Sequence, residues 1–311
     1  MIKSKILILG SGPAGYTAGI YAARACLEPI LLTGASKGGQ LTTTTDVENY
    51  TGFPKPVQGS WLMEQMEEHA KNVGVKIIED TATSVNLKTS PFEIITANNS
   101  KMYTDALIIA TGAVAKWLNL PSENKFRGYG VSGCATCDGF FYRGKEVAVV
   151  GGGNTALEEA LYLCNHASKV TLIHRRGAFR GDMTMQQRVI NHPKINIIWN
   201  HVVDEIIGDD NPKSVTALNI KNAVAGTIST LPINGVFIAI GHKPNTDLFR
   251  GQIDLDNDGY IKTQAGTSIT NISGVFAAGD VQDKIYRQAI TSAGSGCIAA
   301  LDAEKYLSST L

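Results

Sequence analysis

Short uninterrupted runs of apolar residues alternate along the chain with glycine-rich turns and helix-compatible segments, which predicts buried parallel strands. Ile6–Leu9 is the first such run, and Gly-Ser-Gly-Pro-Ala-Gly follows it at once. Tyr16–Ala25 is then rich in residues compatible with a helix. The pattern Gly-x-Gly-x-x-Gly between a strand and a helix is typical of a dinucleotide site, because its glycines allow a tight turn and close approach to a pyrophosphate. The residues expected there are Gly10, Gly12, Pro13, Ala14 and Gly15.

The same arrangement recurs in the middle of the chain. Glu146–Val150 predicts another buried strand, Gly-Gly-Gly-Asn-Thr-Ala matches Gly-x-Gly-x-x-Ala, and a helix is expected over Leu157–Cys164. A second nucleotide loop is therefore expected. Its residues are Gly151, Gly153, Asn154 and Thr155.

Basic residues follow the next strand of this second unit. Val170–Ile173 runs into His174, Arg175 and Arg176, and Arg180 lies four residues further on. An acidic residue at this strand end binds the ribose 2′-hydroxyl of NAD, whereas arginines accommodate the 2′-phosphate of NADP. We therefore expect an NADP-specific site with His174 as a nucleotide contact. The alternative is that the arginines only solvate the end of a strand.

Two other predicted strands end in glycine, where the backbone can approach a ligand closely. They are Asp105–Gly112 and Gly274–Asp280. The Asp280 carboxylate is placed to accept a hydrogen bond from a sugar hydroxyl, and an ordinary strand-end turn is the alternative. The strand Pro29–Leu32 ends in Thr-Gly, without the acidic residue expected at an adenosine ribose. The group that binds that ribose therefore stays open at this point.

A Cys-x-x-Cys pair lies just upstream of the second glycine loop. Cys134 and Cys137, with Asp138 directly behind them, indicate a redox-active disulfide. A structural zinc site is the alternative, but it needs four ligands and no second pair exists. The remaining cysteines, which stand alone, are Cys26, Cys164 and Cys297. A carboxyl beside a leaving thiolate is where a general acid is wanted, and a helix N-cap is the other interpretation of Asp138.

Length and charge limit the class of protein further. The chain has 311 residues, more than one core usually organises, which predicts two domains. Its formal net charge is zero, so it lacks the electrostatic footprint of a nucleic-acid or anionic-membrane binder. No apolar run approaches the ~18 residues of a membrane span, and the N-terminal residues are expected to form a strand, not a signal peptide. Five cysteines form no disulfide framework, so a reducing cytoplasm is expected.

Together these motifs make the whole chain similar to the low-molecular-weight thioredoxin reductases of the bacterial type. The stretches that carry the resemblance are Gly38–Thr45, Cys134–Phe141, Gly151–Leu163, His174–Arg176 and Gly279–Ser292. The resemblance implies an α/β fold of two Rossmann-like, three-layer nucleotide-binding domains, with FAD on the first, NADPH on the second, a homodimer, and thioredoxin as the protein substrate. The NADPH domain, residues 114–243, is then inserted into an FAD domain made of residues 1–113 and 244–311.

The resemblance also implies roles for single residues. Cys137 would face the flavin, Cys134 would attack the substrate disulfide, and Asp138 would supply and remove protons. The contacts to FAD outside the first glycine loop would be Gly34, Gly39, Gln40, Leu41, Thr45, Asn49, Ala110, Thr111, Gly112, Gly279, Asp280, Arg287, Gln288 and Ala289. This set would supply the ribose contact that is missing after the second strand.

The expected chemistry moves electrons from NADPH through FAD to the disulfide and on to thioredoxin. Because the cysteines and the NADPH loop share one inserted segment, we expect that segment to rotate about Gly112-Ala113 and Gly241–Pro244 between half-reactions. The alternatives are a flavoprotein reductase of another disulfide partner, of the peroxiredoxin or thioredoxin-like type, and a noncatalytic NADPH sensor. No metal is expected, because the calcium-like Asp254–Gly259 has Ala265 where a bidentate glutamate is needed.

Overall fold

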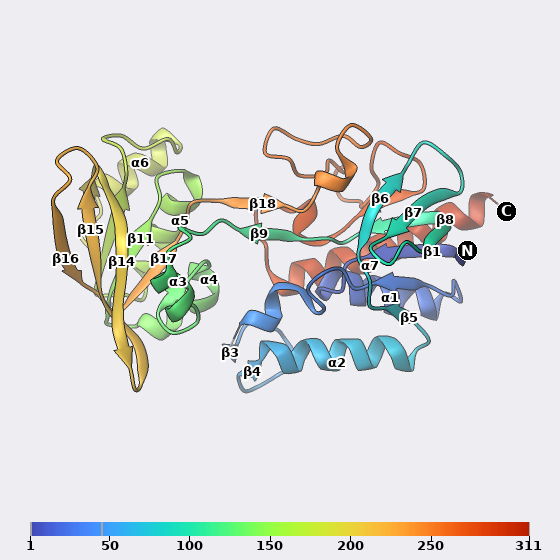
Figure 1. The fold of residues 1–311 in the computed structure, drawn as a ribbon, viewed down its shortest axis with the longest axis horizontal. Coiled ribbons are helices and arrows are strands. Elements are labelled where there is room, and N and C mark those ends of the chain that lie inside the picture. The colour runs from blue at the N-terminus through green and yellow to red at the C-terminus, as the bar shows by residue number, and fades with distance from the viewer. Residues whose placement is uncertain (1, 45, 311) are drawn as a thin grey trace. The chain divides into compact units, whose positions relative to one another are not determined.

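The computed structural model describes residues 2–44 and 46–310, which form two compact units. Residues 1–114 and 243–311 make up the first unit, and residues 115–242 make up the second. The chain enters the second unit through β9 (Ala113–Ala115) and returns through β18 (His242–Pro244), and these two strands pair with each other (Figure 1). The second unit is therefore an insertion in the sequence of the first, connected by two short crossings.

A seven-stranded sheet organises the first unit. Its strands are β1 (Ile2–Leu9), β2 (Ile30–Leu32), β5 (Lys76–Ile78), β6 (Ala82–Asn86), β7 (Phe92–Thr96), β8 (Lys101–Ile109) and β19 (Val275–Ala277). β1 pairs in parallel with β2 and with β8, and β19 joins β8 in parallel from near the end of the chain. β7 and β6 continue the sheet as an antiparallel hairpin. The carboxyl ends of β1, β8 and β19 therefore meet at one edge.

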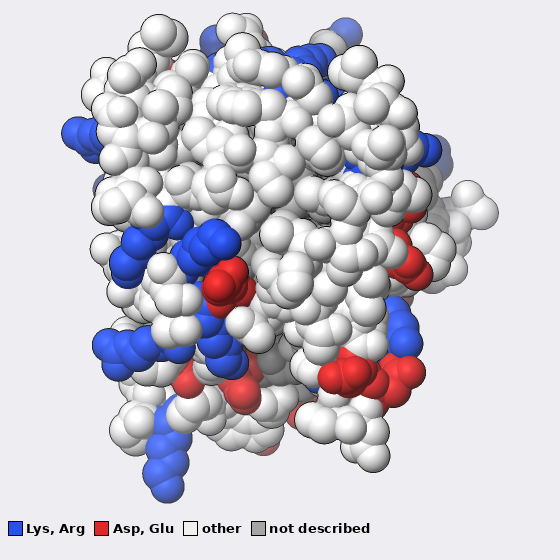
Figure 2. Space-filling view, turned by 90° about the vertical axis from the view of Figure 1, so that its left-hand side faces the viewer, with Lys and Arg blue, Asp and Glu red and all other residues white. Residues whose placement is uncertain are grey.

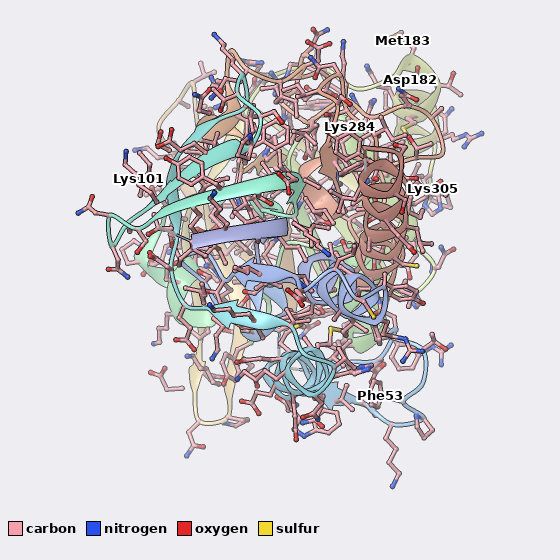
Figure 3. All side chains as sticks on the ribbon, turned by 90° about the vertical axis from the view of Figure 1, so that its right-hand side faces the viewer. Phe53, Lys101, Asp182, Met183, Lys284 and Lys305 are labelled. Atoms are coloured by element: carbon pink, nitrogen blue, oxygen red, sulfur yellow. A yellow bond between two sulfur atoms is a disulfide. The ribbon has the colours of Figure 1, made fainter. Side chains whose placement is uncertain are left out.

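Helices α1 (Pro13–Arg24), α2 (Gly59–Asn72) and α7 (Ala289–Thr310) cover one face of this sheet (Figure 3). Ile6 and Ile8 of β1 pack into the core on that face, and Leu7 and Leu9 pack into a second core with Phe249, because alternate residues of a strand point to opposite faces. Residues Ile6–Leu9 of β1 are buried on both faces, which is why this half of the strand is one continuous apolar run. The shorter elements of this unit are η1 (Gly39–Thr43), β3 (Asp46–Val47), β4 (Val57–Gln58), η3 (Asp247–Phe249) and η4 (Gly279–Val281).

The second unit has a five-stranded parallel sheet in the order β10-β17-β11-β12-β13. These strands are β10 (Val131–Ser132), β11 (Glu146–Val150), β12 (Lys169–His174), β13 (Ile195–Trp199) and β17 (Gly235–Ile238). One face packs on the helix α5 (Asn154–Leu163), and the other packs on an antiparallel meander, β14 (His201–Asp210), β15 (Lys213–Asn222) and β16 (Ile228–Pro232). The remaining elements are α3 (Pro121–Phe126), α4 (Ala135–Asp138), η2 (Gly139–Tyr142) and α6 (Met183–Ile190).

The predicted α/β class is confirmed, since each unit is built on parallel strands with helices packed against them. The helices begin earlier than the sequence pattern indicated. α1 starts at Pro13 and α5 at Asn154, inside the glycine-rich loops, because Gly12 and Gly153 have the extended backbone of an N-cap residue. The first turn of each helix is therefore part of its loop.

The surface carries both signs of charge. On the side of the second unit that bears β14, β15 and β16, Lys and Arg side chains gather beside Asp and Glu side chains (Figure 2). Across the described ranges, no helix combines the length and the apolar character needed to cross a bilayer. No three His, Cys, Asp or Glu side chains of the described residues gather as metal ligands would.

Candidate functional site

The turn between β1 and α1 presents backbone N–H groups at a helix N-terminus. Gly10 has φ +111°, a conformation that favours glycine, and a side chain on Gly15 would collide with the Gly10 carbonyl. At Gly12 no atom of the described residues lies within 4 Å of the position that a Cβ would take. Among those residues no side chain caps α1 either. Pro13, which has no N–H, begins the first turn, and the N–H groups of Ala14 and Gly15 follow it, so this N-terminus fits an anion such as a pyrophosphate.

Ser11 links this turn to the loop after β2. Its hydroxyl donates to the Thr33 carbonyl at 2.9 Å and accepts the Gly38 N–H at 2.9 Å. Sequence reasoning did not single out Ser11, because the bond depends on a contact between positions 27 residues apart. Gly34 lies in the same loop, where its N–H donates to the backbone carbonyl of Asp80.

The 3-10 helix η1 brings three predicted flavin contacts beside the first glycine loop. Gly39, Gln40 and Leu41 all lie in it, and a Cβ on Gly39 would lie 3.3 Å from the Cα of Gly12. The Gln40 side-chain amide donates to the Ala113 carbonyl. Thr45, the next predicted contact, lies outside the described residues.

The ends of β8 and β19 complete this edge. Ala110, Thr111 and Gly112 follow β8, and the Gly10 turn is packed so closely that a side chain there would strike the Ala110 carbonyl. Asn245, which sequence reasoning missed, exchanges two hydrogen bonds with Thr111, of 2.8 and 2.9 Å. These bonds tie the segment after β8 to the segment after β18.

Asp280 is the acidic group at this edge. Gly279 and Asp280 form the start of η4, and Gly279 packs against Ala14 of α1. Burial raises the pKa of Asp280 to about 6, although a hydrogen bond from Ser292, 2.9 Å long, and the charge of Arg287 act in the other direction. The hydrogen bond from Ser292 and the charge of Arg287 therefore do not offset the effect of burial on this carboxyl.

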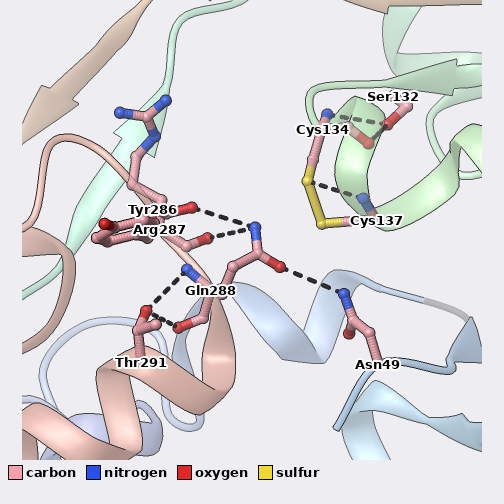
Figure 4. Close-up of a disulfide and its surroundings, with 8 residues drawn as sticks. All are labelled: Asn49, Ser132, Cys134, Cys137, Tyr286, Arg287, Gln288 and Thr291. Carbon is pink, nitrogen blue, oxygen red and sulfur yellow. Dashed lines mark hydrogen bonds between the residues drawn. A yellow bond between two sulfur atoms is a disulfide. The ribbon is translucent and has the colours of Figure 1, made fainter. Parts of the chain in front are cut away.

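The predicted contacts near the start of α7 also lie together. The Asn49 side-chain amide donates to the Gln288 side chain at 3.3 Å, and Gln288 in turn donates to the carbonyls of Tyr286 and Arg287 (Figure 4). Arg287 has φ +47° and its guanidinium donates to the Lys284 carbonyl. Ala289 is the first residue of α7.

The second glycine loop repeats the arrangement of the first. Gly151 lies where a side chain would strike the Ala239 carbonyl, and at Gly153 the described residues leave the Cβ position open within 4 Å. Among them none caps α5 with a side chain. Asn154 and Thr155 form its first turn, and Asn154 accepts the N–H of Asp182 at 2.7 Å. This N-terminus is also suited to a phosphate group.

The end of β12 carries a buried histidine, and exposed arginines follow it. His174 is 3% exposed, its Nε2 lies 3.1 Å from the Ala178 carbonyl, and its ring fills the space where a side chain on Gly152 would project. Burial lowers the pKa of His174, and the charges of Arg180 and Arg176 lower it further. The arginine side chains at 175, 176 and 180 are exposed beside the loop, and the Arg180 N–H donates to the Gly152 carbonyl at 2.8 Å.

The cysteine pair forms a disulfide within the second unit. Cys134 and Cys137 are bonded, with their Cα atoms 5.3 Å apart, and Cys134 is the N-cap of the short helix α4 (Figure 4). The Cys137 N–H donates to Cys134 Sγ at 3.1 Å. Burial raises the pKa of Asp138, the next residue, and a hydrogen bond from Ser132 opposes this shift. The other cysteines are free: Cys26 is exposed, Cys164 is buried and Cys297 is half-buried.

Residues 4–296 match the family model described as pyridine nucleotide-disulphide oxidoreductase. The chain belongs to this family. The second unit of this chain holds a cysteine disulfide and one of the two glycine-rich loops. The family relation also means that a flavin and a pyridine nucleotide are the cofactors to be fitted to the two glycine loops.

Relatives of this oxidoreductase specify the family more closely. A protein of Rickettsia felis named thioredoxin reductase is 60% identical over 306 residues, which cover 98% of this chain and 99% of the relative. The structure of thioredoxin reductase from Giardia duodenalis has a TM-score of 0.95 and 43% identity, covering 99% and 100% of the two chains. The thioredoxin reductase structure from Streptococcus pyogenes has a TM-score of 0.93, 37% identity and 99% coverage of both chains. The resemblance inferred from the sequence is thus confirmed, and with it the pair of Rossmann-like domains.

Both glycine loops of this oxidoreductase fit a dinucleotide. Each has an uncapped helix N-terminus among the described residues and an open glycine, Gly12 in one unit and Gly153 in the other. The first unit adds an acidic acceptor, Asp280, and the second adds exposed arginines after the following strand. The two sites therefore differ in what they offer beyond the pyrophosphate.

Proposed function

We propose that this oxidoreductase is an NADPH-dependent thioredoxin reductase. In the net reaction NADPH and one proton convert the disulfide of oxidised thioredoxin into two thiols and leave NADP⁺. The observation that carries the proposal is the Cys134–Cys137 disulfide with the half-buried Asp138 directly behind it, in the unit that also holds the second glycine loop. A disulfide can exchange with a protein disulfide through a thiolate, which a nucleotide cannot do alone.

Cys134 is the thiolate that we assign to attack on thioredoxin. Once the disulfide is reduced, Cys134 Sγ can keep the hydrogen bond from the Cys137 N–H, which is 3.1 Å long here. A bond to the charged form lowers a pKa, so more of Cys134 is thiolate at neutral pH. Cys137 then closes the disulfide again and expels the thioredoxin thiol.

Asp138 is the proton donor and acceptor of the pair in this proposal. Because burial raises its pKa, the carboxyl holds a proton more readily near neutral pH than an exposed aspartate does. Reduction of the disulfide leaves one sulfur as a thiolate and needs a proton for the other. A carboxyl adjacent to Cys137 in the chain is suited to exchange that proton.

The two cofactors are assigned to different units. We assign FAD to the first unit, with its pyrophosphate at Gly12 and a sugar hydroxyl on Asp280. NADPH is assigned to the second unit, with its pyrophosphate at Gly153 and its 2′-phosphate among Arg175, Arg176 and Arg180. When bound, FAD supplies the two-electron chemistry that connects hydride transfer from nicotinamide to thiol–disulfide exchange. Asp280, which already accepts a hydrogen bond from Ser292, would accept a second one from a sugar hydroxyl, and the exposed guanidinium groups bind a phosphate dianion.

The proposal includes rotation of the second unit about its two connections. That unit carries both the hydride donor and the disulfide, and both must come close to one flavin. Hydride transfer needs reacting atoms about 3–3.5 Å apart, and the disulfide needs a similar distance, so one arrangement does not serve both. The chain passes between the two units twice, at β9 and at β18. Each of these strands is three residues long.

We further propose that the protein is a cytoplasmic homodimer. Ile290, Ile298 and Leu301 are exposed along one side of α7, and Tyr21 of the adjacent α1 is exposed beside them. A second copy would remove this apolar face from water. Sedimentation of the purified protein tests the dimer, with Leu301→Glu as the variant expected to give monomers and Lys88→Glu, at an exposed residue outside α7, as its control.

A direct experiment tests the function. The purified protein is expected to show a flavin absorption spectrum and to oxidise NADPH rapidly only when oxidised thioredoxin is present. A peroxiredoxin-type protein or another disulfide protein in place of thioredoxin tests the alternative substrate. Absence of bound flavin, or NADPH oxidation that thioredoxin does not accelerate, would contradict the proposal.

A further inference from the structure

We infer that Ser132 is a positioning residue for the redox centre, whose single hydroxyl joins the carboxyl of Asp138 to the backbone of Cys134. The role of Ser132 rests on the proposed function, but the residues that form this network all lie in the second unit. Ser132 is not part of the Cys-x-x-Cys motif, and its side chain does not react. Its role is to hold the proton donor and the attacking cysteine in one network.

Ser132 is placed by the sheet. It is the last residue of β10, the strand that pairs in parallel with β17, and it is 6% exposed. The Cys134 N–H donates to Ser132 Oγ at 3.0 Å, and Oγ lies 3.3 Å from the Cys134 carbonyl oxygen (Figure 4). The side chain of Ser132 therefore determines how the chain leaves the sheet and enters the redox helix α4.

The hydroxyl has one proton and two acceptors for it. One acceptor is the Cys134 carbonyl, 3.3 Å from Oγ, and the other is the Asp138 carboxyl, whose pKa the Ser132 hydroxyl lowers as a hydrogen-bond donor. An ionised carboxylate is the stronger acceptor, so it takes the hydroxyl proton when Asp138 is charged. When Asp138 is protonated, the carboxyl can donate to Oγ, and the hydroxyl proton turns to the Cys134 carbonyl. Ser132 thus exchanges partners as Asp138 gains or loses its proton.

This exchange reaches the attacking sulfur through the backbone. Cys134 is the N-cap of α4, and its Sγ accepts the N–H of Cys137. Ser132 forms hydrogen bonds with both backbone groups of Cys134. These bonds fix the backbone of Cys134 and therefore the direction in which its Sγ meets the Cys137 N–H. Removing the hydroxyl takes the Ser132 acceptor away from the Cys134 N–H and takes a donor away from the Asp138 carboxylate.

Other titratable side chains lie near this end of the redox helix but do not replace Ser132. Tyr142 of η2 senses the Asp138 charge, which together with burial raises the pKa of Tyr142 to about 12, so the phenol stays neutral. From the side of α5, Tyr162 and His166 lie against Gly139, where a Cβ would be 3.3 to 3.5 Å from their rings. Of these groups only Ser132 bonds both to Asp138 and to the cysteine backbone.

The test measures the proton on Asp138 and the N–H of Cys134 in the oxidised, flavin-loaded protein. The infrared band of the protonated Asp138 carboxyl is identified by its loss in Asp138→Asn, and its pH midpoint is compared among variants. Ser132→Ala is expected to raise the midpoint by about one pH unit, since a hydrogen bond to the charged form is lost. Hydrogen exchange at the Cys134 amide is expected to accelerate about fivefold or more.

Two controls separate this role from general packing. Ser132→Thr keeps the hydroxyl and is expected to restore both readouts, and Thr171→Val removes another buried hydroxyl from the same sheet without changing either. Thermal unfolding shows that each variant is folded. An unshifted midpoint or an unchanged amide exchange rate in folded Ser132→Ala would overturn the inference. Neither readout requires turnover. A failure of the proposed thioredoxin reduction can therefore be distinguished from a failure of this inference.

Discussion

Asp280 shows how one buried carboxyl can report on a binding site. Its pKa is raised from the usual 3.8 to about 6, first by burial. A raised pKa means that protonation favours the folded, flavin-free protein. This contribution is complete below the unfolded pKa and is lost as the pH rises through about 6.

The first prediction therefore compares the flavin-free protein with its Asp280→Asn variant. As the pH rises from 4 to 7, the wild type is expected to lose stability relative to the variant, by on the order of 2–3 kcal/mol. Thermal unfolding at several pH values measures it, and the exposed Asp254→Asn serves as the control. With FAD added the order reverses, because only the carboxylate accepts the hydroxyl strongly, and the variant is expected to bind FAD about tenfold or more weakly. Equal pH dependence of the two proteins would contradict the burial argument.

At the scale of elements, replacing Gly12 or Gly15 of the first loop with alanine is expected to have different effects. Gly12 has φ −71° and open space at its Cβ position among the described residues, whereas a Cβ on Gly15 would collide with the Gly10 carbonyl. Gly12→Ala is therefore expected to leave the melting temperature of the flavin-free protein unchanged and to abolish FAD retention. Gly15→Ala is expected to lower that melting temperature. If Gly12→Ala kept its flavin after ultrafiltration, the pyrophosphate would lie elsewhere.

The strand–loop–helix element around β12 predicts cofactor choice. Each charged hydrogen bond to a phosphate contributes about 1.5–3 kcal/mol, so the arginines are expected to favour NADPH over NADH by roughly 10²-fold or more. Replacing Arg175 and Arg176 with Ala should raise the KM for NADPH and scarcely affect NADH. Arg188→Ala, in the last turn of α6, is the matched control. An unchanged ratio of the two KM values in the double variant would show that other groups hold the 2′-phosphate.

These elements also show what the sequence can predict. Both strand–loop–helix units were predictable because the apolar run, the glycines and the helix are neighbours in the chain. The contacts of Asn245 with Thr111 join positions 134 residues apart, and no local pattern encodes such a pair. Ser292 lies within a stretch that carried the family resemblance, but its bond to Asp280 depends on how α7 packs beside η4. His174 was expected to contact the nucleotide, and only the fold reveals that its ring is buried against Gly152.

At the scale of the whole molecule, the account requires the second unit to change its orientation. A crosslink that fixes the two units in one orientation is expected to permit one half-reaction and to block turnover. Rapid-mixing measurements of flavin reduction by NADPH and of flavin reoxidation by the disulfide distinguish the two halves. Cleaving the crosslink should restore activity, which controls for damage. Normal thioredoxin reduction by a verified, fully crosslinked protein would make the rotation unnecessary.

The most direct test of the account is steady-state thioredoxin reduction by the wild type, Cys134→Ser and Cys297→Ser, with flavin reduction by NADPH followed in the same proteins. Cys297 is a half-buried free cysteine of α7, so its replacement is expected to change little. Cys134→Ser is expected to lose thioredoxin reduction while NADPH still bleaches its flavin, because hydride transfer precedes the disulfide step. Full thioredoxin reduction by Cys134→Ser would contradict the assignment of the disulfide as the route of the electrons.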